Sequence, residues 1–257
     1  MFENLLKSFL FAKREFKERY VGTSLGQFWY LLSPLVMIFI YTVIFSDFMK
    51  MKLNIIDNSY SYSIYLISGL FAWTSFSTII MRLNTIFFEK AHLIKKINIP
   101  IYTFMISVIL SEFFLFAISM VLAIIFLVIV SHPITATFLY LIPIMLMQTI
   151  FALGVGVIFA LFTPFFKDLK EVIPILTQLW FWATPIIYLS DMIADRYPAI
   201  LEFNPFYHFV KLYQDIFLYS KAPAIKDFLL IGSISIITLL VAIYLYKKMV
   251  STIKDII

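Results

Sequence analysis

Six long apolar runs occupy most of the chain, and each is long enough to cross a lipid bilayer as a helix. A helix needs about 20 mostly apolar residues to cross a hydrocarbon core of roughly 30 Å. The runs cover residues 28–48, 62–83, 102–130, 138–166, 172–189 and 228–246. None of them alternates apolar and polar residues, as the strands of a membrane β-barrel do. The pattern predicts an all-α integral membrane fold with six transmembrane helices in a single domain, residues 1–257.

Residues 1–22 have the pattern of an amphipathic helix rather than that of a span. Apolar residues recur there at helical spacing, with Lys7, Arg14 and Lys17 between them. The apolar positions are Phe2, Leu5, Leu6, Phe9, Phe16 and Tyr20. We expect this helix to lie in the headgroup region, with its basic face towards anionic lipid. Packing on a partner protein is the alternative.

Two connections between the spans are too long to be simple turns. Residues 84–99 mix apolar and charged side chains and precede Pro100, which favours a short surface helix that a soluble partner binds. A solvated loop is the alternative. Residues 190–227 combine many aromatic residues with prolines, so they are too polar to span and too apolar to lie freely in water. We expect one or two short re-entrant or interfacial helices there, broken at Asn204-Pro205.

Composition and charge agree with this architecture. Hydrophobic residues make up 62% of the chain and charged residues 14%, against roughly 45–50% and about 25% in soluble domains. Fourteen of the 20 lysines and arginines precede the first run, follow the sixth, lie after the second or fourth, or, as Arg82 does, lie at the end of the second. The positive-inside rule then predicts that both termini are cytoplasmic. The net charge of +5 is explained by this orientation, so no nucleic-acid partner is expected.

Motifs for catalysis or cofactor binding are scarce. None of the six glycines precedes a lysine, so the phosphate-binding loop is missing and any ATP must bind to another chain. The chain has no cysteine, and its three histidines share no metal-type spacing, so we expect no metal or cofactor on it. Asp191 and Asp195 have the spacing of a magnesium-binding pair in a membrane prenyl transferase. Without a second acidic cluster, a solvated loop edge is the favoured interpretation.

Two kinds of side chain inside the runs are functional candidates. Glu112 lies well within the third run, which indicates either a functional acid or a hydrogen-bonded structural one. Aromatic residues make up 19% of the chain, and some of their rings could stack on the C–H faces of sugars along a transport route. The candidates are Trp29, Tyr30, Tyr41, Trp180, Trp182 and Tyr188. Contact with lipid, or packing, is the alternative for each of them.

Several stretches resemble a known family of membrane transporters. The most specific is RYVGTSLGQFW at 19–29, and the shorter ones are LSPL at 32–35, LIKK at 93–96, FKD at 166–168, TPIIY at 184–188 and NPF at 204–206. In this order they resemble the ABC-2-type permeases that export O-antigen, capsule and teichoic acid polysaccharides. Two places depart from the family. Ile99 and Ile101 flank Pro100 where the family often has an aromatic residue and an arginine, and an arginine is common near Gln214.

The resemblance implies a homodimer in the bacterial cytoplasmic (inner) membrane. Each subunit would pair with a separate cytosolic ATPase that holds the ATP and magnesium. Residues 84–99 would be a coupling helix that touches this ATPase through Phe87, Phe88, Glu89, Lys90, Leu93, Lys95 and Lys96. The N-terminal helix would be an interfacial gate helix, with Lys13, Arg14, Lys17, Arg19 and Tyr20.

The resemblance also implies an outer gate and a cargo. Residues 190–227 would form the gate on the far side of the membrane, with Asn204, Pro205 and Phe206 in it. The first and fifth spans would border the path of a lipid-linked polysaccharide, in the first place an O-antigen. Membrane lipids complete the expected partners.

Three other functions stay open on the sequence. An ABC-2 exporter could carry another cargo, such as teichoic acid, capsule polysaccharide, a drug or a lipid. A membrane-embedded prenyl or glycosyl transferase would use Asp191 and Asp195. An ion-coupled transporter would use Glu112.

Overall fold

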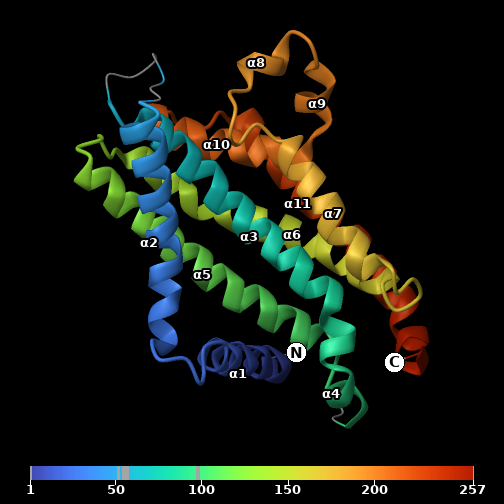
Figure 1. The fold of residues 1–257 in the computed structure, drawn as a ribbon. Helices are drawn as coiled ribbons and strands as arrows, with labels where there is room; N and C mark the ends of the chain where they lie inside the picture. The colour runs from blue at the N-terminus through green and yellow to red at the C-terminus, as the bar shows by residue number, and fades with distance from the viewer. Residues whose placement is uncertain (1, 51–52, 54–57, 97–98, 257) are drawn as a thin grey trace.

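A computed structural model describes residues 2–50, 53, 58–96 and 99–256, and within these ranges the regular structure is all helical (Figure 1). Five helical stretches are long and apolar enough to cross a membrane. They are Gly26–Ser46, Ser61–Glu89, Tyr102–Ile129, Ala136–Phe162 and Ile225–Lys254. Their main helices are α2 (Trp29–Tyr41), α3 (Ser61–Glu89), α5 (Tyr102–Ile129), α6 (Leu141–Phe162) and α11 (Ile225–Ile256). The predicted all-α membrane fold is confirmed.

The predicted span 172–189 is wrong as a continuous helix. Helix α7 covers Leu169–Trp182, and its 14 residues reach only about 21 Å at roughly 1.5 Å per residue. Beyond Trp182 the chain is irregular, and α3 satisfies its carbonyl groups: the Tyr62 hydroxyl donates to the Ile187 carbonyl and the Tyr65 hydroxyl to the Tyr188 carbonyl, both at 2.7 Å. Five candidate spans, rather than six, are therefore present among the described residues.

The two ends of the bundle carry different short helices (Figure 1). The start of α1 (Phe2–Glu18), α4 (Ala91–Lys96) and the end of α11 lie at one end, which we call the inner end. Helices α8 (Asp191–Ala194) and α9 (Pro198–Phe203) lie at the opposite, outer end. Helix α10 (Pro205–Tyr219) also lies towards the outer end, where it packs against α3, α6 and α11. Residues 97–98 of the predicted 84–99 helix lie outside the described residues.

Helix α3 is the centre of the bundle. In the most apolar stretch of α3, 83% of the residues are buried, whereas 17% are buried in the corresponding stretches that contain α2 and α11. Helix α6 packs closely on both α3 and α11 because it has glycines at the contacts. A Cβ added to Gly156 would lie 2.6 Å from a methyl carbon of Leu83, and one added to Gly154 would lie 2.9 Å from the backbone carbon of Thr238. The outward faces of α2 and α11 are left for lipid or for another subunit.

Helix α1 lies across the inner end instead of running along the spans (Figure 1). Two glycines make the bend between α1 and α2, because Gly22 has φ +88° and Gly26 has φ +50°, a region that disfavours other residues. The end of α1 is tied to α2 by Phe16 and Tyr30, whose rings stack with centroids 4.1 Å apart. Helix α1 packs along α5, so it forms part of the folded bundle.

Candidate functional site

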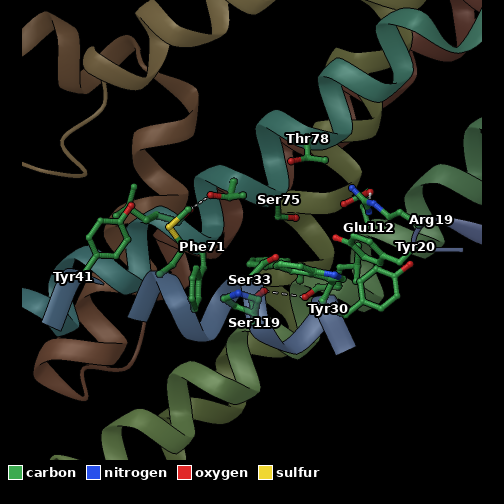
Figure 2. A pocket seen from close by; sticks show the side chains of 17 residues that line it. Arg19, Tyr20, Tyr30, Ser33, Tyr41, Phe71, Ser75, Thr78, Glu112 and Ser119 are labelled. Atoms are coloured by element: carbon green, nitrogen blue, oxygen red, sulfur yellow. Dashed lines mark hydrogen bonds and ion pairs between the residues drawn. The ribbon is translucent and has the colours of Figure 1, made fainter. Parts of the chain in front are cut away.

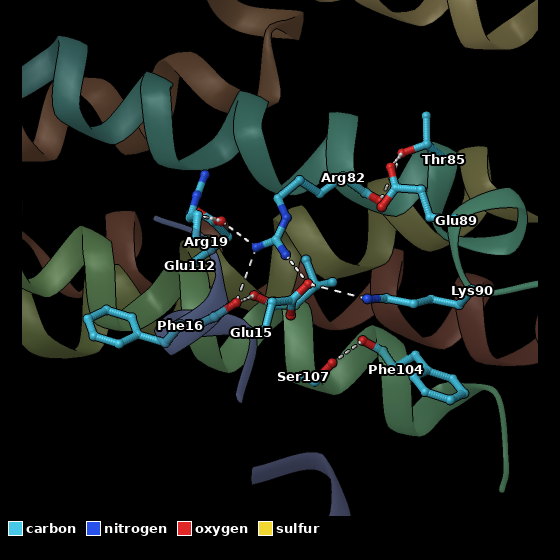
Figure 3. Close-up of polar contacts among 12 residues, drawn as sticks. Glu15, Phe16, Arg19, Arg82, Thr85, Glu89, Lys90, Phe104, Ser107 and Glu112 are labelled. Carbon is cyan, nitrogen blue, oxygen red and sulfur yellow. Dashed lines mark hydrogen bonds and ion pairs between the residues drawn. The ribbon is translucent and has the colours of Figure 1, made fainter. Parts of the chain in front are cut away.

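A cluster of charged side chains lies at the inner end, between α1, α3 and α5 (Figure 3). We call Glu15, Arg19, Arg82, Lys90 and Glu112 the charge cluster. Glu112 Oε1 accepts from Arg82 Nη1 at 2.5 Å and from Arg19 Nη1 at 2.8 Å. Arg82 Nη2 donates to Glu15 Oε1, and Lys90 Nζ lies 3.8 Å from the same oxygen. One guanidinium thus joins the carboxylates of α1 and α5.

Burial makes these pairs structurally important. The Glu112 side chain is 5% exposed and that of Arg82 is 23% exposed. A buried carboxylate is strongly unfavourable unless it is paired and hydrogen-bonded, and here two arginines pair with it. The sequence allowed two interpretations of Glu112, a functional acid or a hydrogen-bonded structural one. Its contacts with Arg82 and Arg19 are those of a hydrogen-bonded structural acid. Arg19, which the resemblance assigns to the interfacial gate helix, directly follows α1 and pairs with Glu112.

A cavity of about 220 Å³ adjoins this cluster (Figure 2). Helices α2, α3 and α5 each contribute one face to its walls, because the lining residues on each helix recur at helical spacing. They are Trp29, Tyr30, Ser33, Pro34, Met37 and Tyr41 on α2, Leu70, Phe71, Thr74, Ser75 and Thr78 on α3, and Glu112, Leu115, Phe116 and Ser119 on α5. Arg19 and Tyr20 complete the lining. The charge cluster and the cavity share Arg19 and Glu112, so they form one candidate site.

Only three of the six aromatic residues predicted to line a transport route line this cavity. Trp29, Tyr30 and Tyr41 line it, and so does Tyr20. The three candidates from the fifth predicted span are elsewhere. Trp180 donates its Nε1–H to Asn204 Oδ1 at 2.8 Å, the Tyr188 hydroxyl donates to the Trp182 carbonyl at 2.7 Å, and Trp182 is 55% exposed on the surface.

The hydroxyl side chains of this lining were not predicted from the sequence. The hydroxyl residues Ser33, Thr74, Ser75, Thr78 and Ser119 all face the cavity. Serine and threonine are ordinary in membrane helices, because their hydroxyls bond to the carbonyl of the preceding turn. The usable signal was their recurrence at three- and four-residue spacing on α3, which places Thr74, Ser75 and Thr78 on one face.

The outer end is organised around Asn204. Its Oδ1 accepts from the Phe206 and Tyr207 amides at the start of α10, and its Nδ2 donates to the Thr184 hydroxyl at 2.8 Å and to the Ala183 carbonyl at 3.2 Å. Pro205 occupies the first turn of α10, where its missing N–H is not needed. The Phe206 ring is fully buried and stacks on Phe76 with centroids 4.2 Å apart. Asn204 and Phe206 therefore anchor α10 to the bundle, and Pro205 begins the helix.

At the inner end, the predicted coupling residues fall into two groups. Phe87 is fully buried in the core, so its side chain is not accessible to a partner. Phe88 lies under Lys170, whose Nζ is 3.3 Å from the ring centroid, and Lys90 belongs to the charge cluster. Glu89, Lys95 and Lys96 are exposed, and Leu93 is partly exposed. Residues 84–89 extend α3, and only Ala91–Lys96 form the separate helix α4.

The turn between α6 and α7 is held against the inner end of α3. Asn84 ties it to α3, because its Oδ1 accepts from the Thr163 hydroxyl at 2.5 Å and its Nδ2 donates to the Leu169 carbonyl at 3.3 Å. Phe166 and Lys167 in this turn are exposed. Helix α4 and the turn therefore both present exposed side chains at the inner end (Figure 1), basic on α4 and both basic and aromatic in the turn.

The remaining predicted residues lie on the surface. Lys13, Arg14 and Lys17 on α1 are exposed, and Arg14 pairs with Glu18 one turn away at 2.7 Å. Asp191 and Asp195 are exposed at α8. Among the described residues, no group of three or more histidine, cysteine, aspartate or glutamate side chains is placed to hold a metal ion.

The fold and site define a multi-pass helical membrane protein with a cavity lined by aromatic, aliphatic, hydroxyl and charged side chains. Residues 8–218 match the family model described as ABC-2 type transporter, so the chain belongs to that family. The O-antigen export system permease protein RfbA of Klebsiella pneumoniae is 29% identical over 208 residues, which cover 80% of this chain and 78% of that protein. The protein of the same name from Myxococcus xanthus is 25% identical over 239 residues, covering 92% and 90%.

Proposed function

We propose that this protein is the membrane subunit of an ATP-driven exporter of lipid-linked polysaccharide, in the first place an O-antigen. The observation that carries the proposal is the alignment of 92% of the chain with a relative named as an O-antigen export permease. The cavity is consistent with it, because aromatic rings and hydroxyl groups together suit a sugar chain. The membrane is the bacterial cytoplasmic membrane, with the inner end of the bundle in the cytoplasm.

The ATP and its magnesium belong to a separate subunit in this proposal. The sequence lacks a phosphate-binding loop, so the energy source must come from a partner. The inner surface of α4 and the α6–α7 turn suits such a partner, since Lys95, Lys96 and Phe166 are exposed there. Two copies of the permease, each with one ATPase, would complete the transporter.

The charge cluster offers a mechanical connection from that surface to the cavity. Lys90 is the single residue between α3 and α4, and it lies 3.8 Å from Glu15 of α1. A movement of α4 would therefore act on α1 through Glu15 and on the cavity wall through Arg82, Glu112 and Arg19. Binding energy at the ATPase would in this way bias the bundle between a closed and an open arrangement.

A cross-linking experiment tests the coupling surface. Because the chain has no cysteine, Lys95→Cys introduces a single thiol on α4. We expect a heterobifunctional maleimide reagent to join it to an ATPase subunit in native membranes. The matched control is Lys226→Cys, near the start of α11 at the outer end, which should give no such product. Equal yields from both variants, or no ATPase in the product, would contradict the proposal.

The cargo is tested separately by export. A strain that lacks this gene should lose surface polysaccharide and regain it with the wild-type chain. Restored export of a drug or of a lipid alone would favour an ABC-2 exporter of another cargo. Loss of product after Asp191→Ala and Asp195→Ala, in a stable protein, would favour the transferase. Transport that continues without ATP hydrolysis, and that a stable Glu112→Gln protein loses, would favour the ion-coupled transporter.

A further inference from the structure

We infer that the cavity between α2, α3 and α5 is a binding site for one sugar ring of the cargo within each subunit. The inference rests on the proposed function and goes further, since it assigns the contact to a cavity in one chain and to Ser75 in particular. At about 220 Å³ the cavity is smaller than ordinary small-molecule pockets, which run to about 300–1,000 Å³. A single ring fits such a space better than an oligosaccharide.

The Ser75 hydroxyl is the observation that points to a ligand. Ser75 is 7% exposed, lines the cavity, and its Oγ has no hydrogen-bond partner (Figure 2). Two other hydroxyls of the lining bond within their own helices: Thr74 donates to the Leu70 carbonyl at 2.7 Å, and Ser119 donates to the Leu115 carbonyl at 3.1 Å. A buried hydroxyl without a partner does not favour folding. A bound hydroxyl group would supply the missing partner.

The other groups of the lining match the two sides of a sugar ring. The rings of Tyr20, Trp29 and Tyr30 offer surfaces for its C–H face. Tyr30 is held in place before any ligand arrives, because its hydroxyl donates to the Phe16 carbonyl at 2.5 Å and its ring contacts Tyr20 at 4.8 Å between centroids. Arg19 and Glu112, also in the lining, provide charged hydrogen-bonding groups for hydroxyls.

A lipid chain is a poorer occupant of this cavity. Such a chain would leave Ser75 unpartnered and cover the Arg19–Glu112 pair with hydrocarbon. A second cavity shows what an apolar site looks like in this protein. It measures about 560 Å³ between α5 and α6, and apart from Thr135 its lining is apolar, with Phe113, Met120 and Leu139 among its residues. The hydroxyl and charged groups among its lining residues therefore distinguish the sugar site from this apolar cavity.

Thiol protection measures binding directly. Thr78→Cys places one thiol in the cavity, and Thr85→Cys places a matched thiol two turns further along α3, outside it. The full transporter complex in amphipol would be labelled with a methanethiosulfonate reagent, with dodecyl maltoside or dodecyl phosphocholine added. We expect the maltoside, whose head is a sugar, to slow labelling of Thr78→Cys several-fold, with no effect on Thr85→Cys. Equal protection by both detergents would mean that the alkyl chain binds, and would overturn the inference.

Removing the hydroxyl separates binding from folding. In the Thr78→Cys background, Ser75→Ala should weaken maltoside protection by about threefold to tenfold, the loss of one hydrogen bond. Thermal stability should stay unchanged, because this hydroxyl bonds to nothing in the protein. The control Ser77→Ala removes a buried hydroxyl that donates to the Thr74 carbonyl at 3.2 Å, away from the cavity, and should leave protection unchanged.

The export assay distinguishes failure of the sugar site from failure of the proposed function. If the wild-type chain exports polysaccharide while Ser75→Ala neither weakens protection nor lowers export, the sugar site is overturned and the proposed function stands. If the wild-type chain restores no polysaccharide export, the proposed function fails first, and the inference fails with it.

Discussion

At the scale of single residues, Arg82 has the most consequential position in the molecule. Its guanidinium donates to Glu112 of α5, to Ser111 Oγ at 3.2 Å and to Glu15 of α1. Arginine suits this place because its planar group presents several donors in a fixed geometry. A single ammonium group cannot reach both carboxylates in the same way. The attachment of α1 to the bundle therefore depends on arginine in particular.

Replacing Arg82 by lysine should destabilise the protein although the charge is kept. We expect a loss of about 1–3 kcal/mol, below the roughly 3–5 kcal/mol for breaking a fully buried pair, because the Arg82 side chain is 23% exposed. Thermal unfolding followed by scanning fluorimetry in detergent measures it. The matched control is Arg196→Lys, the same change at an exposed arginine of the outer segment, with almost no effect expected. Similar melting temperatures for the two variants would show that the cluster contributes little.

At the scale of elements, the ends of helices α7 and α10 are joined by Asn204. The Trp180 indole of α7 donates to the same Oδ1 that caps α10. Both the cap and the cross-contact use the acceptor, whereas Nδ2 bonds to Ala183 and Thr184. The amide thereby satisfies groups of three segments with one side chain.

Asn204 variants should lose stability in a fixed order. Asn204→Ala removes the cap and the cross-contacts, so we expect a loss of about 2–4 kcal/mol, more than the roughly 1 kcal/mol of a lone cap. Asn204→Asp keeps an acceptor for the cap and for Trp180 but loses the Nδ2–H donor, so its loss should be intermediate. Unfolding in denaturant, followed by tryptophan fluorescence, gives the order. An alanine variant as stable as the aspartate variant would contradict the role of the acceptor.

Helix packing is the second property that belongs to this scale, and two glycines test it as a matched pair. A Cβ at Gly154 would meet the backbone of α11 at 2.9 Å, whereas one at Gly232 would meet only the end of the Met147 side chain at 3.8 Å. Gly154→Ala should cost about 1–3 kcal/mol through overpacking, while Gly232→Ala should be neutral or gain up to about 1 kcal/mol of helix stability. Expression level and melting temperature measure both. A neutral Gly154→Ala would mean that α6 and α11 separate easily.

At the scale of the whole molecule, the bundle has two exposed apolar faces, one on α2 and one on α11, and each can contact either lipid or a second subunit. The stretches of α2 and α11 are each 17% buried. In the homodimer that we propose, α2 borders the path between the subunits, whereas α11 faces lipid. Exposure alone does not separate the two faces, so the distinction needs a measurement.

A pair of cysteine variants makes that measurement. Phe39→Cys on α2 and Leu240→Cys on α11 replace side chains that are 66% and 59% exposed. Oxidation in membranes should give disulfide-linked dimers of Phe39→Cys and few of Leu240→Cys, as judged on a non-reducing gel. Dimers formed only through Leu240→Cys would place the subunit interface on the opposite side of the bundle.

The helical class was predictable from the sequence, because the length of an apolar run is a local property. Sequence reasoning failed at the fifth predicted span, since residues 183–189 are as apolar as the helix before them. What permits an irregular backbone there is a pair of tyrosine hydroxyls from α3, which are distant in sequence. Phe87 was misjudged for a similar reason: it lies just before the charged pair Glu89 and Lys90, but its own side chain is buried in the core.

The candidate site was predictable only in part. Trp29, Tyr30 and Tyr41 were found from their chemistry, because three aromatic residues on one helix face stand out in a sequence. Arg82 was counted with the basic residues that set orientation, and its partner Glu15 was not considered at all. Pairing between α1, α3 and α5 is set by tertiary structure, which no spacing along the chain encodes.

The Trp180–Asn204 hydrogen bond closes a ring of backbone that contains both α8 and α9. Both ends of this outer segment are fixed, whereas side chains between them are exposed, with Met192 70% exposed and Phe203 80% exposed. The entropy of closing a loop grows slowly, so doubling its length costs only about 0.6 kcal/mol. In this protein, insertions or deletions in the outer segment should therefore have little effect on the helix bundle. For the same reason this segment is the place to graft an epitope or a fluorescent label.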